Sequence, residues 1–300
     1  MRTTTWQNIG VDVRGSSNVS DVLKRANLDY TVHKEQMMTP NGLIVPGRMA
    51  TVATINGQDT VLGDVSDKYS ICQNSEAFDF VDNISDELTF EKAGQTSSGM
   101  VYIIASLPEL EVLDDLIKPY VILQNSHNGR YSLKSTITPL RIVCQNQFNY
   151  AFGHSENNIS IIHSSNMMSK LNNAQILLSS VSDYMEAFND NAIKLAGMKL
   201  SKRPEDIISQ FFDMAIKGNE SERVIRKIDE NKQKLISIYD TDDNQNFKGT
   251  VWGMVNAYSD FVTHKEVKST ENADESKFLT VTFNPMVMNR FVDFVMSKAA

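Results

Sequence analysis

Three residues have side chains that could bind a metal or form a nucleophilic pair. Cys144, His154 and His163 follow one another with the spacing Cys-x9-His-x8-His. Zinc ligands occur as closer pairs, such as Cys-x2-Cys or His-x3-His. A thiol beside a histidine can act as a nucleophile, but no third residue can be named to orient the histidine. We therefore expect no metal and a small buried thiol at Cys144, and keep a Cys/His-dependent enzyme as the weaker alternative.

Two loops match known ligand-binding motifs only in part. Residues 42–48 have the glycine spacing of a phosphate loop, but the Lys-Ser/Thr pair is absent and Pro46 has no amide donor. Asp240 begins a series of oxygen-bearing side chains like a calcium loop. Gln245 then stands where the loop needs glycine, and Val251 stands where it needs glutamate. The sequence therefore predicts no cofactor.

The distribution of charge carries more information than its sum. The 300 residues include 29 basic and 37 acidic side chains, for a formal net charge of -8. Such a chain is not a nucleic-acid binder whose whole surface is basic. Residues 116–155, however, contain no acidic residue and are rich in aromatic, amide and hydroxyl side chains. The acid-free window could form one local basic face.

A basic face with aromatic side chains suits single-stranded nucleic acid. Lysine and arginine neutralise phosphates, and an aromatic ring stacked on a base contributes about 1–3 kcal/mol. Amides add uncharged contacts to phosphates and bases. The predicted interface consists of Lys118, Tyr120, His127, Asn128, Arg130, Lys134, Arg141 and Asn146. Arg130 and Lys134 are an even number of residues apart, so they should share one face of a strand.

A purely structural explanation of the same window is also open. Strands that are buried on both faces exclude acids, and their few basic residues then lie at the strand ends. His127, beside Asn128-Gly129, could likewise be a turn residue with no binding role.

The elements that would position these residues are hairpins in the first half of the chain. Asn56-Gly57 supplies the two positive-φ residues of a type I′ turn, and two further glycine-containing loops join β-rich segments. The predicted strand pairs are 49–55 with 60–65, 87–95 with 100–107, and 120–126 with 131–138. Pro139 should end the last strand, because proline cannot donate to the ladder. Short helices are expected at 21–27 and 75–81.

From residue 167 the apolar period changes from 2 to 3.6. A stripe from Leu171 to Leu195 predicts a long helix that ends near Gly197, and further helices follow from about 204, 221, 251 and 285. Residues 278–283 read as a strand. Strands followed by helices indicate an α+β fold, with antiparallel hairpins first and a helical C-terminal part.

We divide the chain into an N-terminal extension (1–41), a strand-rich core (42–165) and a helical part (166–300) packed on that core. No flexible Gly/Ser/Pro linker separates them. No run of about 18 apolar residues suggests a membrane span, and the N-terminus lacks a signal sequence. The two cysteines form no disulfide framework. These features predict a cytoplasmic protein.

Four separated motifs resemble those of a known family. Residues 62–69 with 73–78 are similar to its "G-x-V-x-x-x-Y…Q-N-x-E-A-F" segment, and 126–129 to its "S-H-D/N-G" turn. Residues 138–146 resemble "T-P-V-R-V-V-C-x-N", and 252–264 resemble "W-G-x-x-N-A…H". The family is that of phage- and plasmid-like proteins carrying the domain of unknown function 932. Asn128 and Gln147 depart from its commoner residues.

The resemblance covers about residues 42–264. It implies an origin in a mobile element and a role in the cytoplasm of a bacterial host, without a known chemistry. A strand-rich core followed by a helix is also similar to the single-strand annealing proteins used by phages in recombination, which is a likeness of fold alone.

Three functions remain open at this point. The first is a non-enzymatic phage or plasmid protein that binds nucleic acid, with single-stranded DNA favoured. The second is a protein-interaction factor that modulates or inhibits a host defence complex, and the third is the Cys/His-dependent enzyme. A homo-oligomer is compatible with each.

Overall fold

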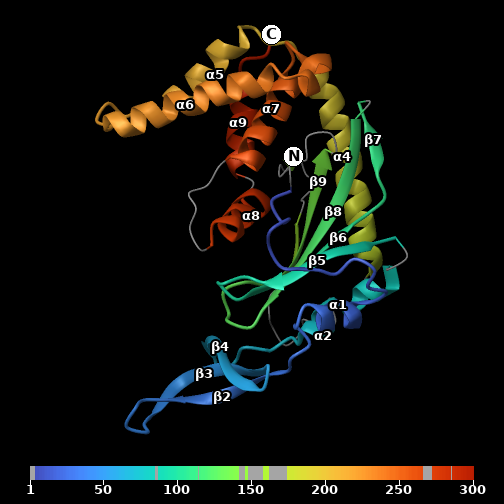
Figure 1. Cartoon of the computed structure of the whole chain (residues 1–300), viewed down its shortest axis with the longest axis vertical. Helices are drawn as coiled ribbons and strands as arrows, with labels where there is room; N and C mark the ends of the chain where they lie inside the picture. Colours follow the sequence, from blue (N-terminus) through green and yellow to red (C-terminus); the bar gives the residue numbers. More distant parts are fainter. Residues whose placement is uncertain are drawn as a thin grey trace.

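The protein is long and is built from three parts stacked end to end (Figure 1). A computed structural model describes residues 4–84, 87–113, 115–141, 146–147, 158–161, 174–265, 272–284 and 286–300. A large antiparallel sheet lies in the middle, a small sheet projects from one end, and a group of helices lies at the other. The molecule therefore has a β-arm at one end and a group of C-terminal helices, the helical arm, at the other.

The large sheet has the strand order β1-β5-β6-β8-β9-β10, and β7 and β11 pair with β8 and β9. All of its ladders are antiparallel. Its strands are β1 (Val11–Asp12), β5 (Thr89–Gln95), β6 (Met100–Ser106), β7 (Leu110–Val112), β8 (Asp115–Ser126), β9 (Leu133–Arg141), β10 (Asn146–Gln147) and β11 (Asn158–Ile161).

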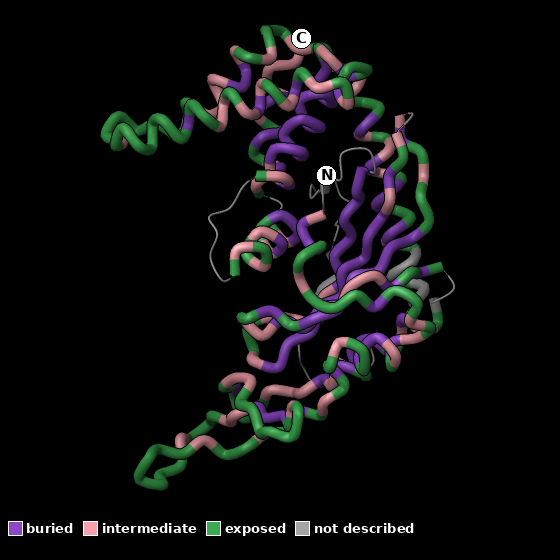
Figure 2. The backbone as a smooth tube through the Cα atoms, viewed as in Figure 1, coloured by how far each residue is buried: buried purple, intermediate pink, exposed green. Residues whose placement is uncertain are grey.

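The small sheet, which we call the β-arm, has the order β2-β3-β4. It comprises β2 (Val32–Met38), β3 (Ile44–Ile55) and β4 (Gln58–Ser66). Asn56 and Gly57 have φ values of 53° and 77°, as the predicted type I′ turn requires. The tube in Figure 2 is mostly exposed along this arm, whereas the central strands are buried.

Both faces of the large sheet are covered. Residues such as Val121 and Leu123 lie on one face in a core with α1, α2 and α4, while Ile122 lies on the other with Trp6 and α8. The N-terminal and central helices are α1 (Val19–Arg25), α2 (Asn74–Phe78), η1 (Asp79–Ile84) and α4 (Ala174–Gly197). Burial on both sides explains why β6 and β8 contain almost no charge.

The C-terminal helices form a bundle around α7. They are α5 (Pro204–Asp213), α6 (Glu222–Tyr239), η2 (Asp242–Phe247), α7 (Val251–His264) and α9 (Met286–Met296), whereas α8 (Ala273–Phe283) packs on β9 of the large sheet. Nearly every residue of α7 is buried, and α4, α6 and α9 pack against it. Tyr258 of α7 stacks on Phe291 of α9 with ring centroids 3.9 Å apart.

The predicted apolar stripe is confirmed over the part of α4 whose side chains are described. Val181, Met185, Phe188, Ala192 and Leu195 are all buried, and the helix ends at Gly197. The fold class is α+β as predicted, with the antiparallel sheets in the first half of the chain and the helices mostly in the second.

Pro139 does not end its strand, contrary to prediction. It lies inside β9, directly opposite Pro119 of β8. The carbonyl of Pro119 accepts a hydrogen bond from the amide of Leu107 at 2.9 Å, so Pro119 directs its polar groups toward β6. Pro119 and Pro139 thus form a non-hydrogen-bonded pair, in which neither backbone nitrogen faces the partner strand. The two prolines therefore remove no hydrogen bond from the β8–β9 ladder.

Residues 278–283 are helical, not a strand. Phe278, Val281 and Thr282 are buried on one side of α8, with the spacing of a helix. Asp274 and Glu275 lie in its first turn, where negative charge is favourable. The apolar run at 278–283 is too short for its length to distinguish a helix from a strand.

Residues of the predicted N-terminal extension take part in both cores. Trp6 packs on one face of the large sheet, and Val22 and Leu23 of α1 pack on the other. Val11 and Asp12 pair with β5 through Ala93 and Lys92. The first part of the chain thus completes the edge of the large sheet.

Candidate nucleic-acid interface

The eight predicted interface residues are spread along the β8–β9 hairpin. Arg141 pairs with Ile117 at one end of the hairpin, and His127, Asn128 and Arg130 form the turn at the other. A strand rises about 3.3 Å per residue, so the ladder that separates these ends is about 25 Å long. The residues therefore do not form one compact site.

Lys118 and Tyr120 contact a carboxylate that lies outside the acid-free window. Lys118 Nζ is 3.1 Å from Glu91 Oε1, and the Tyr120 hydroxyl donates to the same carboxylate at 3.2 Å. The ring of Tyr120 lies 4.8 Å from that of Trp6, centroid to centroid. Burial, followed by the charge of Glu91, raises the pKa of Tyr120. This ring is therefore covered and not open to a base.

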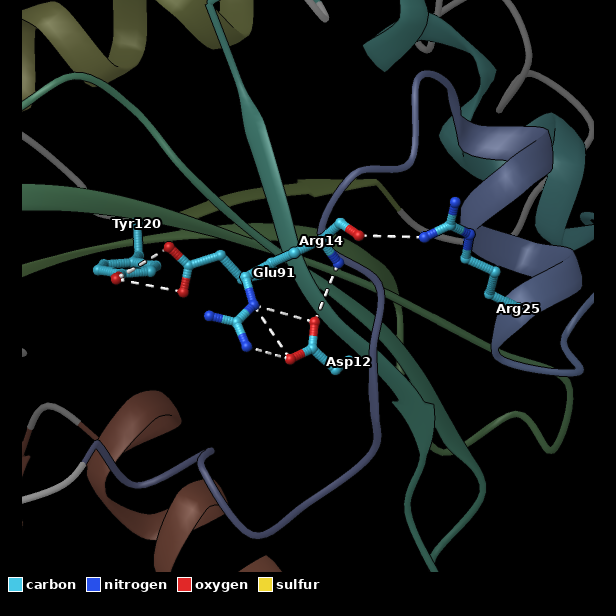
Figure 3. Close-up of polar contacts among 5 residues, drawn as sticks. All are labelled: Asp12, Arg14, Arg25, Glu91 and Tyr120. Atoms are coloured by element: carbon cyan, nitrogen blue, oxygen red, sulfur yellow. Dashed lines mark hydrogen bonds and ion pairs between the residues drawn. The ribbon is translucent and has the colours of Figure 1, made fainter.

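The N-terminal segment closes this side of the sheet (Figure 3). Arg14 forms an ion pair with Asp12, and hydrogen bonds from Arg14 lower the pKa of the Asp12 carboxyl to about 2. Arg25 of α1 donates to the carbonyl of Arg14 at 3.0 Å. Figure 3 shows this pair next to Glu91 and Tyr120, so charges of both signs meet here and the region is not a basic face.

Arg141 is buried in an ion pair. Its Nε and Nη2 atoms donate to the two carboxylate oxygens of Asp115 at 2.8 and 2.9 Å, and Nη2 also donates to the carbonyl of Asp243 at 2.8 Å. The residue is 4% exposed. Asn146 lies in β10 and is the backbone partner of Arg141 in β9; the side chain of Asn146 is not among those described. Arg141 thus connects the sheet to the helical part.

His127 and Asn128 stabilise the hairpin turn. His127 is 2% exposed, and its Nε2 lies 3.0 Å from Asn74 Oδ1. Asn128 donates from Nδ2 to the carbonyl of Ser98 at 2.7 Å and accepts from the amide of Arg130 at 3.0 Å. The polar side chains of His127 and Asn128 therefore stabilise the turn and its contacts with neighbouring segments.

Residues of two family motifs form a polar junction between the β-arm, α2 and the β8–β9 turn. Gln73 accepts from the amide of Val32 at 2.9 Å and donates to its carbonyl at 2.8 Å, which holds the start of β2. Tyr69 donates to the carbonyl of Ser126 at 2.9 Å, and Thr51 donates to the carbonyl of His127 at 2.6 Å. We call this set, with Asn74, the arm junction.

The interface prediction missed Gln73 and Asn74. The signal was the motif at 73–78, which begins with two amides; Asn74 is buried and Gln73 is partly buried, and such side chains mostly hydrogen-bond to backbone or to each other. A polar pair next to a predicted helix start could have indicated this role.

A second joint lies between η2 and α7 and includes Gly253 of the last motif. Asn244 donates to the carbonyls of Tyr239 and Gly253 at 3.2 and 3.1 Å. A Cβ at Gly253 would lie 2.3 Å from the carbonyl oxygen of Phe247, so only glycine allows this approach. Together with the Arg141–Asp243 contact, this joint holds the helical part to the sheet.

Arg130 and Lys134 differ from the other predicted cations. Neither forms a salt bridge with any carboxylate in the described part of the chain. Arg130 is exposed in the turn, so it does not share a strand face with Lys134 as predicted. Lys134 is half-buried on β9, with Nζ 5.9 Å from the ring centroid of Phe283, and burial lowers its pKa.

One carboxylate lies near Arg130. Asp64 is bonded to Arg48, which lowers the pKa of its carboxyl, and Arg130 adds a smaller effect of the same sign. Asp64 is thus already neutralised by another arginine, and the guanidinium of Arg130 keeps its exposed position.

The three residues considered for metal binding or thiol chemistry are not in the described part of the chain. Cys144, His154 and His163 all lie beyond the described residues. The other cysteine, Cys72, is buried next to the arm junction, and burial raises its pKa to about 12. Within the described ranges, no group of His, Cys, Asp and Glu side chains has the arrangement of a metal site.

Comparison with known proteins yields one match. The family model described as "Domain of unknown function (DUF932)" matches residues 61–280, which include all four motifs. No curated protein and no solved structure matches the chain. A search of the described helices finds none with the length and apolar character needed to cross a bilayer.

Proposed function

Because the chain belongs to the domain of unknown function 932 family, whose name states no activity, we propose its function from the geometry: a non-enzymatic protein that binds single-stranded nucleic acid. The phage or plasmid setting implied by the resemblance belongs to the same proposal. Host cytoplasm is the compartment that this setting requires.

The proposal is carried by the two predicted interface cations that form no salt bridge with an acid in the described part of the chain. Arg130 and Lys134 come from the acid-free window, and neither has a salt bridge with a described acid. Lys118 and Arg141 are neutralised by Glu91 and Asp115, so they are no longer part of the proposed interface. A free guanidinium and a half-buried ammonium are suited to phosphate groups.

Fluorescence anisotropy with a labelled oligo-dT tests the proposal over a series of salt concentrations. Each phosphate contact on a single strand contributes about -0.7 to the slope of log K against log salt. Arg130→Ala with Lys134→Ala should therefore weaken binding and make the slope shallower by roughly 1.4. The matched control is Lys24→Ala with Lys194→Ala, which removes two exposed lysines on other faces.

Two results would overturn the proposal. One is no binding by the wild-type protein at low salt, and the other is binding that salt does not weaken. An equal loss in the control variant would show only a general effect of net charge.

A second candidate function rests on the β-arm. Residues 37–47, around the β2–β3 turn, carry no charge, and Met38, Leu43 and Ile44 are 61%, 67% and 62% exposed. An exposed apolar tip of this kind is typical of a protein-interaction surface. This observation favours the interaction factor, with a host complex as the proposed partner.

Affinity capture from nuclease-treated host lysate tests this second function. Leu43→Ser with Ile44→Ser should abolish a captured band that the wild-type protein retains. Val61→Ser is the control, because Val61 is 68% exposed on the same arm but on β4, away from the tip. Capture that is unchanged in the tip variant would rule out the tip as the interface.

A further inference from the structure

A carboxylate of α8 is bound by the turn that joins β5 and β6. Glu275 accepts hydrogen bonds from the backbone amide of Ser97 at 2.9 Å and from the Ser97 hydroxyl at 2.8 Å. Among the described residues, no lysine, arginine or histidine forms a salt bridge with Glu275. Residues 96–99, which we call the Ser97 turn, thus supply two neutral donors to one anion.

The Ser97 turn lies next to the turn that carries Arg130. Asn128 donates to the carbonyl of Ser98 at 2.7 Å, and the Tyr131 hydroxyl donates to the Ser98 hydroxyl at 2.9 Å. Arg130 lies between these two residues in the sequence and is exposed. Donors that bind a carboxylate and an arginine suited to phosphate therefore occur at the same end of the large sheet.

The other end of α8 lies against the second cation of the proposed interface. Lys134 Nζ is 5.9 Å from the ring centroid of Phe283, which is eight residues from Glu275, or about 12 Å along the helix axis. Between them, Phe278 packs on Tyr102 with ring centroids 5.3 Å apart. α8 thus covers the sheet from the Ser97 turn to β9, beside the large sheet in Figure 1.

α8 is attached to the smaller of the two buried clusters. Phe278 belongs to that cluster, and no residue of α8 belongs to the larger cluster that contains α4 and α7. A helix attached in this way can leave the sheet while the larger core stays folded.

Carboxylate and phosphate oxygens accept hydrogen bonds from the same amide and hydroxyl donors. We propose that the Ser97 turn is a phosphate subsite for single-stranded nucleic acid, and that Glu275 occupies this subsite and makes α8 autoinhibitory. The inference rests on the proposed function, because α8 contacts the Ser97 turn beside Arg130 and also contacts Lys134.

Binding of nucleic acid and docking of α8 then exclude each other. The measured affinity equals the intrinsic affinity multiplied by the fraction of molecules in which α8 has left the sheet. Weakening the contact of Glu275 raises that fraction and strengthens binding. By the same linkage, bound nucleic acid must release α8.

Oligo-dT binding by two single variants of the full chain tests the inference. Glu275→Ala removes the hydrogen bonds to Ser97 and should bind at least about fivefold more tightly than the wild-type protein. Asp274→Ala is the matched control, because it removes the same charge from the first turn of α8 at an exposed residue. An equal gain in both variants would show an effect of net charge alone and would overturn the inference.

Hydrogen–deuterium exchange on the wild-type protein needs no variant. Peptides from α8 should exchange faster when oligo-dT is bound, because the helix is released, while peptides from the buried helix α7 stay unchanged. Slower or unchanged exchange in α8 would overturn autoinhibition.

The outcomes separate this inference from the function on which it rests. If Glu275→Ala binds like Asp274→Ala while the Arg130/Lys134 variant loses binding, the inference fails and the proposed function stands. If the wild-type protein binds no oligonucleotide, both fail. A gain in Glu275→Ala that disappears when Arg130 and Lys134 are also replaced by alanine would support both.

Discussion

Asn74 is the residue on which the arm junction depends most. Its Oδ1 accepts from Asn125 Nδ2 and lies 3.0 Å from His127 Nε2, while its Nδ2 donates to the carbonyl of Leu28 at 2.9 Å. The side chain is buried, so water cannot replace these contacts.

Asn74→Ala should lower the free energy of unfolding by about 1–3 kcal/mol, because buried polar groups lose their partner. Urea denaturation measures it. Asn83→Ala is the control, since Asn83 is exposed and makes only a 3.5 Å bond to Phe80, and a change below about 0.5 kcal/mol is expected there. Equal effects of the two substitutions would contradict a special role for Asn74.

The same scale shows why the interface prediction was only partly useful. Within the described part of the window, up to residue 141, the absence of acids marks the buried strands β8 and β9. It could not show that Glu91 and Asp115, which both lie outside the window, neutralise Lys118 and Arg141. A count of acidic residues along the sequence does not show which carboxylates strand pairing places next to a lysine or arginine.

At the scale of elements, hairpins were predicted well because turns are local. Asn56-Gly57 and the glycine-containing loops specify their own backbone angles, and the strands on either side follow. The long helices were predicted well because many turns of one period leave little ambiguity. α8 and Pro139 were predicted wrongly because their structure depends on a neighbouring strand or sheet face.

The close contact between η2 and α7 requires glycine at position 253, which a substitution can test. In Gly253→Ala the new methyl group would lie 2.3 Å from a backbone oxygen, so α7 must shift, and we expect a loss of about 1–3 kcal/mol in the free energy of unfolding. Gly197→Ala, at the end of α4, meets nothing within 4 Å and should leave stability equal or slightly higher.

Thermal and urea unfolding of the two glycine variants provide the comparison. A Gly253→Ala protein as stable as Gly197→Ala would mean that η2 and α7 do not pack as closely as described.

At the scale of the whole molecule, the β-arm and the helical arm lie at opposite ends of the large sheet. A compact chain of 300 residues would have a radius of gyration of about 19 Å. The two arms place mass far from the centre, and the tube in Figure 2 is exposed over long stretches of both.

Small-angle X-ray scattering should therefore give a radius of gyration clearly above about 19 Å and an asymmetric distance distribution. Light scattering on the same sample must give the monomer mass of 33.7 kDa for the comparison to hold. A monomer with a radius near 19 Å would contradict the extended arrangement.

The sequence by itself determined the local features and the fold class. Turn residues specify hairpins, and a sustained 3.6 period specifies helices, because both depend on side chains that are close along the chain. Four motifs also placed the chain in its family.

Only the tertiary structure decided which charges are available. Lys118 and Arg141 are neutralised by Glu91 and Asp115, which reach them across strands, whereas Arg130 and Lys134 form no salt bridge with a described acid and so remain in the proposed interface. Electrostatic energy depends on distance in space and on burial, and neither can be read from order along the chain.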